Sequence, residues 1–188
     1  MAGYLGSYVT NTLTGYIDFN EGKIGNQVNF PAGHIIQVQS KAKTSAFDTQ
    51  STNYTPITGL SVDIDPTYEN SEFLIQVQLS HSAVGDDIGH YYINLTNSIS
   101  GAIFTADLVG SRTSATIVGN FLQRQMLTVP IIYKDSPNTL QTITYGLEVK
   151  VASAGQTYTV NRSGRDTDLA IYDGRATSSI TVFELVGT

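Results

Sequence analysis

The feature that most constrains the fold of this chain is the alternation of apolar and polar residues with a period of two. The segment TITYGLEVKV places five apolar side chains on one side of an extended backbone: Ile143, Tyr145, Leu147, Val149 and Val151. The segment FLIQVQLSH alternates in the same way from Phe73 to Leu79. Because successive side chains of a strand point to opposite faces, both segments are predicted to be strands with one face on a core.

Several shorter segments indicate further strands. LSVDID alternates and is followed by Pro66, which ends it, and HYYINLT alternates from Tyr91 to Leu95. SSITVFELV has apolar residues on both faces, as is typical of a strand near the middle of a sandwich. Further candidates lie at 34–40, 102–108, 124–133 and 156–161, and no segment has a convincing helical stripe. These eight or nine short strands predict an all-β fold, an antiparallel β-sandwich or jelly roll over residues 33–188.

Composition excludes several classes of function. The net charge is −6 and the ten Lys and Arg residues are scattered, which argues against binding to nucleic acid or to an anionic membrane. The chain has no cysteine, so disulfides, thiolate catalysis and cysteine-ligated zinc are excluded. No segment approaches the ~20 apolar residues of a membrane span, and the first residues lack the features of a signal peptide.

The first 30 residues differ from the rest of the chain. They are rich in glycine and carry spaced aromatic residues, too few apolar residues for a core and too many aromatics for a linker. One interpretation is a frayed terminus. The other is an extended arm, residues 1–32, that becomes ordered on a partner and uses as anchors Tyr4, Leu5, Tyr8, Tyr16 and Phe19.

Signals for catalysis or metal binding are weak. No GxSxG elbow, P-loop or GxGxxG motif is present, and the three histidines form no HxH or HxxxH pair. Two alternatives stay open. His81 and His90 could meet across strands and form a weak metal site with Asp86 and Asp87, although polar residues beside a turn are the commoner explanation. A carboxylate pair for glycosidic cleavage could be drawn from four residues: Asp63, Asp65, Glu69 and Glu72.

The segment NRSGRDTDLAIYDGR, residues 161–175, carries the densest charge in a chain that is only 14% charged. Three aspartates, at 166, 168 and 173, could supply oxygens to calcium, but their spacing is not that of an EF-hand and the three arginines would repel a cation. We interpret the segment as a structural loop whose charges pair with one another. Ion pairs between subunits and a ligand site are the alternatives. Gly110, Ser111 and Arg112 form a similar short polar turn.

Five segments, taken in order, resemble a β-rich domain that is frequent in tailed bacteriophages, especially phages of cyanobacteria and marine bacteria. They are FPAGHIIQVQSKAKTSAFDTQSTNYTPITGLSVDIDP (30–66), SEFLIQVQLS (71–80), SRTSAT (111–116), KDSPNTLQTITYGLEVKV (134–151) and VNRSGRDTDLAIYDGRATSSITVFEL (160–185). The opening MAGYLGS also resembles the leader of some phage tail and fibre proteins. The resemblance covers residues 30–188 and transfers no catalytic or ligand residues.

The resemblance implies a non-enzymatic virion component, assembled in the host cytoplasm and forming a homotrimer. We therefore expect a tail-fibre-like protein that docks through residues 1–32 and binds a host surface glycan through the loops 82–90, 110–120 and 161–176, without a cofactor or metal. The candidate contact residues in these loops are Asp86, Asp87, Arg112, Arg162, Arg165, Asp166 and Asp168. A capsid decoration protein or head fibre is the alternative within virion proteins, and a glycan depolymerase is the enzymatic alternative.

Overall fold

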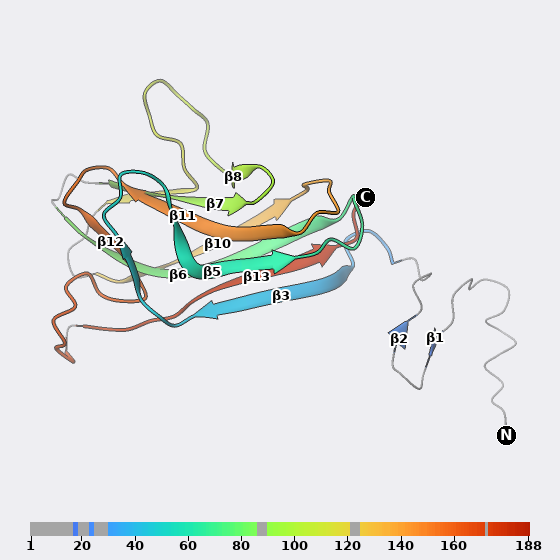
Figure 1. The fold of residues 1–188 in the computed structure, drawn as a ribbon, viewed down its shortest axis with the longest axis horizontal. Helices are drawn as coiled ribbons and strands as arrows, with labels where there is room; N and C mark the ends of the chain where they lie inside the picture. Colours follow the sequence, from blue (N-terminus) through green and yellow to red (C-terminus); the bar gives the residue numbers. More distant parts are fainter. Residues whose placement is uncertain (1–16, 19–22, 25–29, 86–89, 121–124, 172) are drawn as a thin grey trace, which may run out of the picture.

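The computed structural model describes residues 17–18, 23–24, 30–85, 90–120, 125–171 and 173–188. Within these ranges the chain forms strands and connecting loops and no helix, so no described segment is a helix that could cross a membrane. Figure 1 shows two layers of strands, with β3 and β13 on one side of the molecule and β7 and β8 on the other. The all-β sandwich predicted from the alternation is confirmed.

Two antiparallel sheets form the sandwich, and a separate two-stranded sheet precedes them, made of β1 (Ile17–Asp18) and β2 (Lys23–Ile24). The six-stranded sheet contains β3 (Ile35–Lys43), β4 (Phe47–Thr49), β6 (Glu72–Val84), β10 (Leu127–Asp135), β12 (Thr157–Val160) and β13 (Ser178–Leu185). The five-stranded sheet contains β5 (Thr55–Ile64), β7 (His90–Asn97), β8 (Gly101–Ile103), β9 (Ile117–Asn120) and β11 (Ile143–Val151).

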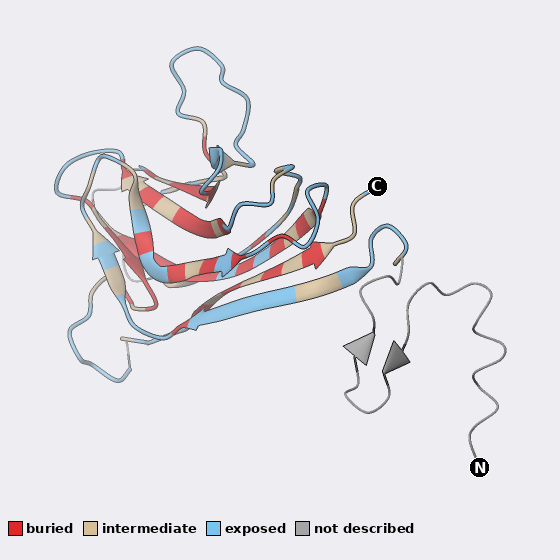
Figure 2. Cartoon of the chain, turned by 45° about the vertical axis from the view of Figure 1, so that its right-hand side comes forward, coloured by how far each residue is buried: buried red, intermediate tan, exposed pale blue. Residues whose placement is uncertain are grey.

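Strand β6 is the longest strand and organises the six-stranded sheet. One of its edges pairs first with β13 and then with β12, and the other edge pairs with β10 along nine residues. β3 lies outside β13 and forms one edge of the sheet, which Figure 2 shows as a largely exposed ribbon. β13 therefore lies inside its sheet, as its apolar residues on both faces predicted.

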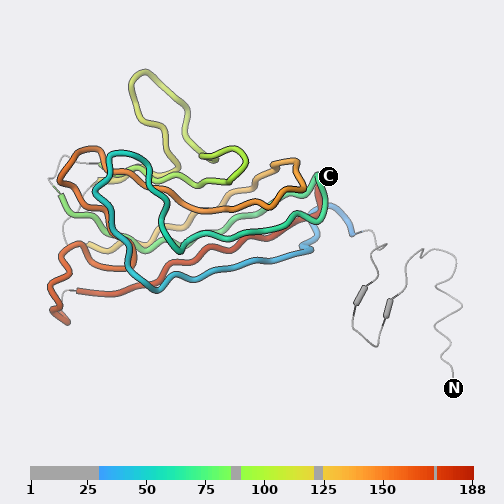
Figure 3. The backbone as a smooth tube through the Cα atoms, in the orientation of Figure 1, coloured from blue at the N-terminus to red at the C-terminus, as the bar shows by residue number. Residues whose placement is uncertain are grey.

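The five-stranded sheet has the order β5, β11, β7, with β8 and β9 sharing the far edge of β7. Most of the loops that join successive strands cross from one sheet to the other, as the tube in Figure 3 lets the reader follow. Within the described part of the two main sheets, β7 and β8 are the one pair of consecutive strands that are hydrogen-bonded to each other. Most pairing is thus between segments far apart in sequence, such as β3 with β13.

The core lies between the two sheets and is made by the predicted inward faces. In β11 all five alternating apolar residues are at most 2% exposed, and in β6 the residues from Phe73 to Leu79 that share its face are at most 3% exposed. The inward residues of β5 and β7 are also buried. Tyr145 is fully buried and its hydroxyl donates to Asp135 Oδ2 at 2.9 Å, so the one polar atom that this ring carries into the core is satisfied.

Some predicted strand boundaries were wrong. The candidate at 102–108 forms a strand only as far as Ile103, after which the chain leaves the sheet as an exposed loop that runs to β9. The strands β4 and β9 were missed because three or four residues are too short for alternation to be visible. β6 continues to Val84, so the predicted loop at 82–90 begins later than expected.

Candidate functional site

The charged loop at 161–176 connects β12 to β13, and Asn161 fixes its base. Asn161 has a positive φ of 61° and is fully buried. Its side-chain amide donates to Lys43 O at 2.8 Å, and its Oδ1 accepts from Ser178 Oγ at 2.6 Å. The loop is therefore tied at its start to the end of β3 and to the start of β13.

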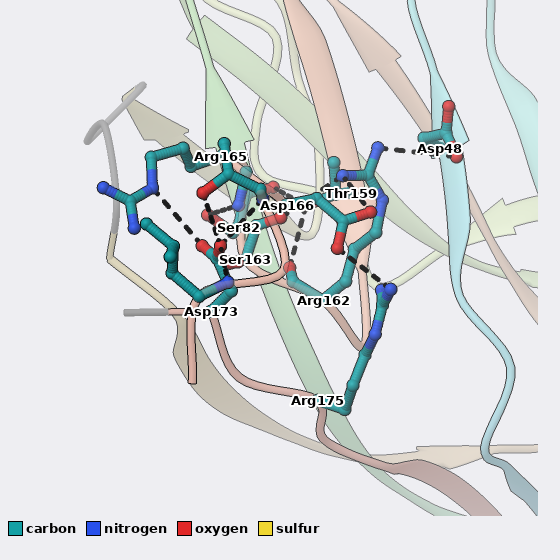
Figure 4. A network of polar contacts seen from close by, with 12 residues as sticks. Asp48, Ser82, Thr159, Arg162, Ser163, Arg165, Asp166, Asp173 and Arg175 are labelled. Carbon is teal, nitrogen blue, oxygen red and sulfur yellow. Dashed lines mark hydrogen bonds and ion pairs between the residues drawn. The ribbon is translucent and has the colours of Figure 1, made fainter. Parts of the chain in front are cut away.

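Four ion pairs form within the charged loop and to the neighbouring strand β4 (Figure 4). Arg162 lies 3.4 Å from Asp166 and 3.7 Å from Asp48, and Arg175 lies 2.9 Å from Asp166. Arg162 and Arg175 also face each other in an isolated β-bridge. The charges pair with one another inside the chain, in agreement with the interpretation as a structural loop.

Asp173 is the organising residue of this loop. Its Oδ2 accepts from the backbone N–H of Thr167 at 2.7 Å, from the Thr167 hydroxyl at 2.7 Å and from the N–H of Leu169 at 3.1 Å. Its Oδ1 accepts from Ser163 Oγ at 3.2 Å and from Arg165 Nε at 3.4 Å. These hydrogen bonds, that of the Thr167 side chain first, hold the pKa of Asp173 well below its usual range. Its oxygens are already occupied by donors, so the sequence-based suggestion that Asp173 could bind calcium is wrong.

The remaining predicted contact residues are spread over the molecule. Asp168 is exposed, with a positive φ of 61°. Arg112 lies at the tip of the loop between β8 and β9, where its Nη1 donates to Val109 O at 3.2 Å. Asp86 and Asp87 lie outside the described residues, as do the arm residues Tyr4, Leu5, Tyr8, Tyr16 and Phe19. Their contact roles stay predictions.

The suggested meeting of His81 and His90 is wrong. His81 is 1% exposed and packs in the core against the rings of Tyr91, at 5.2 Å, and Tyr158, at 5.4 Å. His90 belongs to the other sheet, and its exposed ring lies 6.5 Å from that of Tyr92, on the outer face. Their side chains therefore point to different sides of β7. Burial lowers the pKa of His81 to about 4, because a charged ring would lose its contact with water and no described residue offers it a hydrogen bond. Among the described residues no cluster of metal-ligating side chains occurs.

The four acidic residues considered as a glycosidic pair do not converge. Asp63 is exposed on the outside of the five-stranded sheet and accepts from Thr144 Oγ1 at 2.7 Å. Glu72 lies on the six-stranded sheet and pairs with Lys134 at 2.9 Å. Asp65 accepts from the hydroxyl of Thr142, and Glu69 lies in the exposed turn before β6. Asp63 and Asp65 are therefore neighbours, each held by a threonine hydroxyl, while Glu69 and Glu72 lie elsewhere.

A buried glutamate that sequence reasoning missed lies at the other end of the sandwich. Glu184 is fully buried in β13 and accepts from the hydroxyl of Ser71 at 2.6 Å and from that of Thr67 at 2.9 Å. Gln37 of β3 donates to it at 3.2 Å. Glu184 thus ties the turn before β6 to two strands. Its position on the inward face of an alternating strand was the signal that could have found it.

The outer faces of the two sheets also carry features that the sequence analysis did not single out. On the six-stranded sheet, Val38, Phe183 and Leu74 lie in one row across β3, β13 and β6. On the five-stranded sheet, Lys150 lies opposite Tyr92, and its Nζ is 4.8 Å from the ring centre of Tyr54 and 5.4 Å from that of Tyr92. The outward residues of both faces could be read from the alternation, but their neighbours could not.

Comparisons of this chain with known proteins find matches among solved structures. No family model matches it, and no curated protein matches it. Among solved structures, the chain is similar to one described as "Structure of infectious bursal disease virus Gt strain", with 13% sequence identity and a TM-score of 0.36. The likeness covers 81% of this chain and 42% of that one, so the chain spans less than half the length of that neighbour. A likeness this distant carries no argument about function.

Proposed function

We propose that the chain is a non-enzymatic structural protein of a virus particle, a homotrimeric, tail-fibre-like component of a tailed phage. In this proposal residues 1–32 attach it to the particle and the sandwich binds a host surface glycan. The support comes from the resemblance of the ordered motifs and from the outer face of the six-stranded sheet.

The observation that carries the self-association is an apolar patch on that outer face, here called the outer patch. Val38 and Ile35 are each 49% exposed, and Ile132 is 62% exposed. The strand register places them with half-buried Leu74, Phe183 and Leu185 on the same side of the sheet. Continuous apolar patches rimmed by polar residues mark interaction sites, and we assign this one to a second copy of the chain.

The charges beside the outer patch fit a contact between copies. Lys134 and Glu72 lie at its border and offer both signs of charge within one ion pair of 2.9 Å. Around a threefold axis three copies bring this pair together, so the lysine of each copy can lie beside the glutamate of a neighbouring copy. Burying a fully exposed aliphatic side chain of the size of Val38 or Ile132 stabilises an association by roughly 1.5–3 kcal/mol of free energy. The gain is smaller here in proportion to the part of each side chain that is already buried.

Self-association is tested by light scattering coupled to size exclusion. We expect the full chain, 20.3 kDa per copy, to elute as a trimer. The variants Ile132→Lys and Val38→Glu should elute as monomers or dimers, because a charge is placed in the outer patch. Leu140→Lys is the matched control, because Leu140 is also 62% exposed but lies in the turn between β10 and β11. A monomeric wild-type protein, or Ile132→Lys and Val38→Glu variants that stay trimeric, would refute the role of the outer patch.

Location is tested by electron microscopy of particles labelled with an antibody to this chain. Label on the tail supports the fibre proposal. Label on the head overturns it in favour of capsid decoration, and particles without label overturn the virion role. Deleting residues 1–30 is expected to leave a folded trimer that no longer joins particles, and normal incorporation would contradict the docking role.

The enzymatic alternative is tested by incubating the protein with host polysaccharides and measuring their chain length. We expect no shortening, and a loss of chain length would show a depolymerase.

A further inference from the structure

A hollow of about 490 Å³ lies on the outer face of the five-stranded sheet, between β5, β11 and the end of β7. It is here called the sheet hollow. Its size falls within the roughly 300–1,000 Å³ of small-molecule sites. It lies apart from the charged loop and from the outer patch, and none of the predicted contact residues line it.

The sheet hollow exists because of one glycine and one irregularity in pairing. Gly146 of β11 stands between Tyr145 and Leu147, whose side chains point into the core, so it occupies an outward position where the sheet carries no side chain. A Cβ at this position would lie 3.2 Å from Ser61 Cβ. The register of β5 against β11 shifts between Gly146–Ser61 and Glu148–Pro56, so that β5 bulges beside Leu147.

The lining of the sheet hollow is rich in hydrogen-bond acceptors. The Thr96 hydroxyl donates to Gly146 O at 3.1 Å, and that of Thr144 donates to Asp63 at 2.7 Å. Each of these hydroxyl protons is used within the sheet, while the oxygen lone pairs remain. Ser98 Oγ accepts from Thr144 N at 3.0 Å. Ser61 and Thr58 add two further hydroxyls to the lining.

Glu148 places a carboxylate at one end of the sheet hollow. Its Oε1 accepts from Asn94 Nδ2 at 2.9 Å, which orients the group and leaves Oε2 able to accept two donors from a ligand. No lysine or arginine lines the hollow. A lining of hydroxyls, several of which can both accept and donate, with one carboxylate and no cation fits an uncharged ligand that carries several hydroxyl groups.

Tyr54 and Asn94 lie beside this carboxylate, next to the lining of the sheet hollow and not in it. Tyr54 precedes β5, and Lys150 Nζ of β11 lies 4.8 Å from its ring centre, on the outer face of the sheet. Asn94 is 3% exposed, and neither its Oδ1 nor the Tyr54 hydroxyl has a hydrogen-bond partner of normal geometry.

We propose that the sheet hollow binds a neutral hexose unit of a surface polysaccharide, with Glu148 and the threonine hydroxyls accepting from its hydroxyl groups and the exposed ring of Pro56, which pairs with Glu148 and lines the hollow, facing its C–H face. A pyranose combines several hydroxyl donors with an apolar face, which matches this lining. The inference rests on the proposed glycan binding and moves it from the loops to the face of a sheet.

The test is saturation-transfer NMR on the full chain with the methyl glycosides of glucose, galactose and mannose as probes. We expect at least one of them to bind with a dissociation constant of the order of 1 mM, as for a single weakly held sugar. Ser61→Phe fills the sheet hollow and should abolish the transfer, and Glu148→Gln should weaken binding by about tenfold, the loss of one charge-assisted hydrogen bond.

Two matched controls keep the same substitutions away from the sheet hollow. Ser153→Phe lies in the exposed turn after β11, and Glu69→Gln lies in the exposed turn before β6, so both should bind as the wild type does. Absence of binding to every probe overturns the inference, as does unchanged binding by Ser61→Phe. Loss of binding in Asp168→Asn would move the site to the charged loop and would also overturn it.

The outcomes separate this inference from the proposed function. Particles that carry antibody label while no hexose binds leave the virion role standing and remove the sugar site. Hexose binding that Ser61→Phe abolishes, with particles that carry no label, keeps the sugar site and removes the virion role.

Discussion

The buried histidine of the core makes the stability of this protein depend on pH in a way that can be calculated. His81 is 1% exposed between two tyrosine rings, and neither of its ring nitrogens has a hydrogen-bond partner among the described residues. Burial lowers its pKa to about 4, from 6.5 in an unfolded chain. The folded state therefore excludes a proton that the unfolded state binds below pH 6.5.

The sign and size follow from linkage. Above pH 6.5 both states hold a neutral ring, and stability is unaffected. As the pH falls from 6.5 towards 4, the unfolded state takes up the proton first, so the free energy of unfolding decreases. The difference of about 2.5 pKa units corresponds to about 3.4 kcal/mol over the full range, and to roughly 2 kcal/mol at pH 5. This is a large part of the stability of an ordinary domain.

The assay is urea unfolding followed by circular dichroism at pH 7.5, 6 and 5 and at one protein concentration. In His81→Phe the aromatic packing is kept and the titration is removed, so the decrease between pH 7.5 and 5 should be smaller by about 2 kcal/mol. His90 is exposed, so the free energy of unfolding of His90→Gln should decrease between pH 7.5 and 5 by the same amount as that of the wild type. Equal decreases in His81→Phe and the wild type would refute the reasoning.

Three further predictions concern other buried or close contacts. Asp173→Asn should increase tryptic cleavage in the charged loop, because an amide cannot accept from all its donors, while Asp168→Asn should not. Since the pKa of Asp173 is lowered in the fold, protection of the Thr167 and Leu169 amides from hydrogen exchange in the wild type should persist above about pH 4 and be lost as the pH falls below it towards the lowered pKa. Glu184→Leu should lower the free energy of unfolding by about 3 kcal/mol, because it leaves the buried hydroxyl of Ser71 and the partly buried donors of Thr67 without their acceptor, whereas Glu69→Gln should leave it unchanged. Gly187→Ala should lower the free energy of unfolding by roughly 1–3 kcal/mol, because the added Cβ would collide with Asn70 O. Gly174→Ala should lower it by less than half of that, and thermal denaturation of the two variants compares the losses.

The fold could be predicted because the longer strands β6 and β11 alternate between apolar residues on one face and mostly polar residues on the other. Each core residue of β11 and β6 lies where a period of two places it, since one face must be buried. The order of strands could not be predicted, because most strands pair with partners far away in sequence. The alternation of a strand shows which of its faces is buried and does not show which other strand pairs with it.

The site residues were harder to predict than the fold. The charged loop could be interpreted as self-paired because opposite charges alternate within it, and four ion pairs form there and to β4. The role of Asp173 could not be predicted, because the positions of its donors, two backbone N–H groups and three side chains, depend on the turn that the loop makes. The sheet hollow depends on a register shift between β5 and β11, and no local pattern of residues encodes such a shift.

The central claim is that the protein acts through its sheet faces, with the outer patch joining copies of the chain. A cryo-electron microscopy structure of the purified full chain tests it most directly. The account predicts a threefold assembly in which Val38, Phe183 and Ile132 are buried between copies. An assembly in which these three side chains face solvent, or particles that contain one copy, would contradict it.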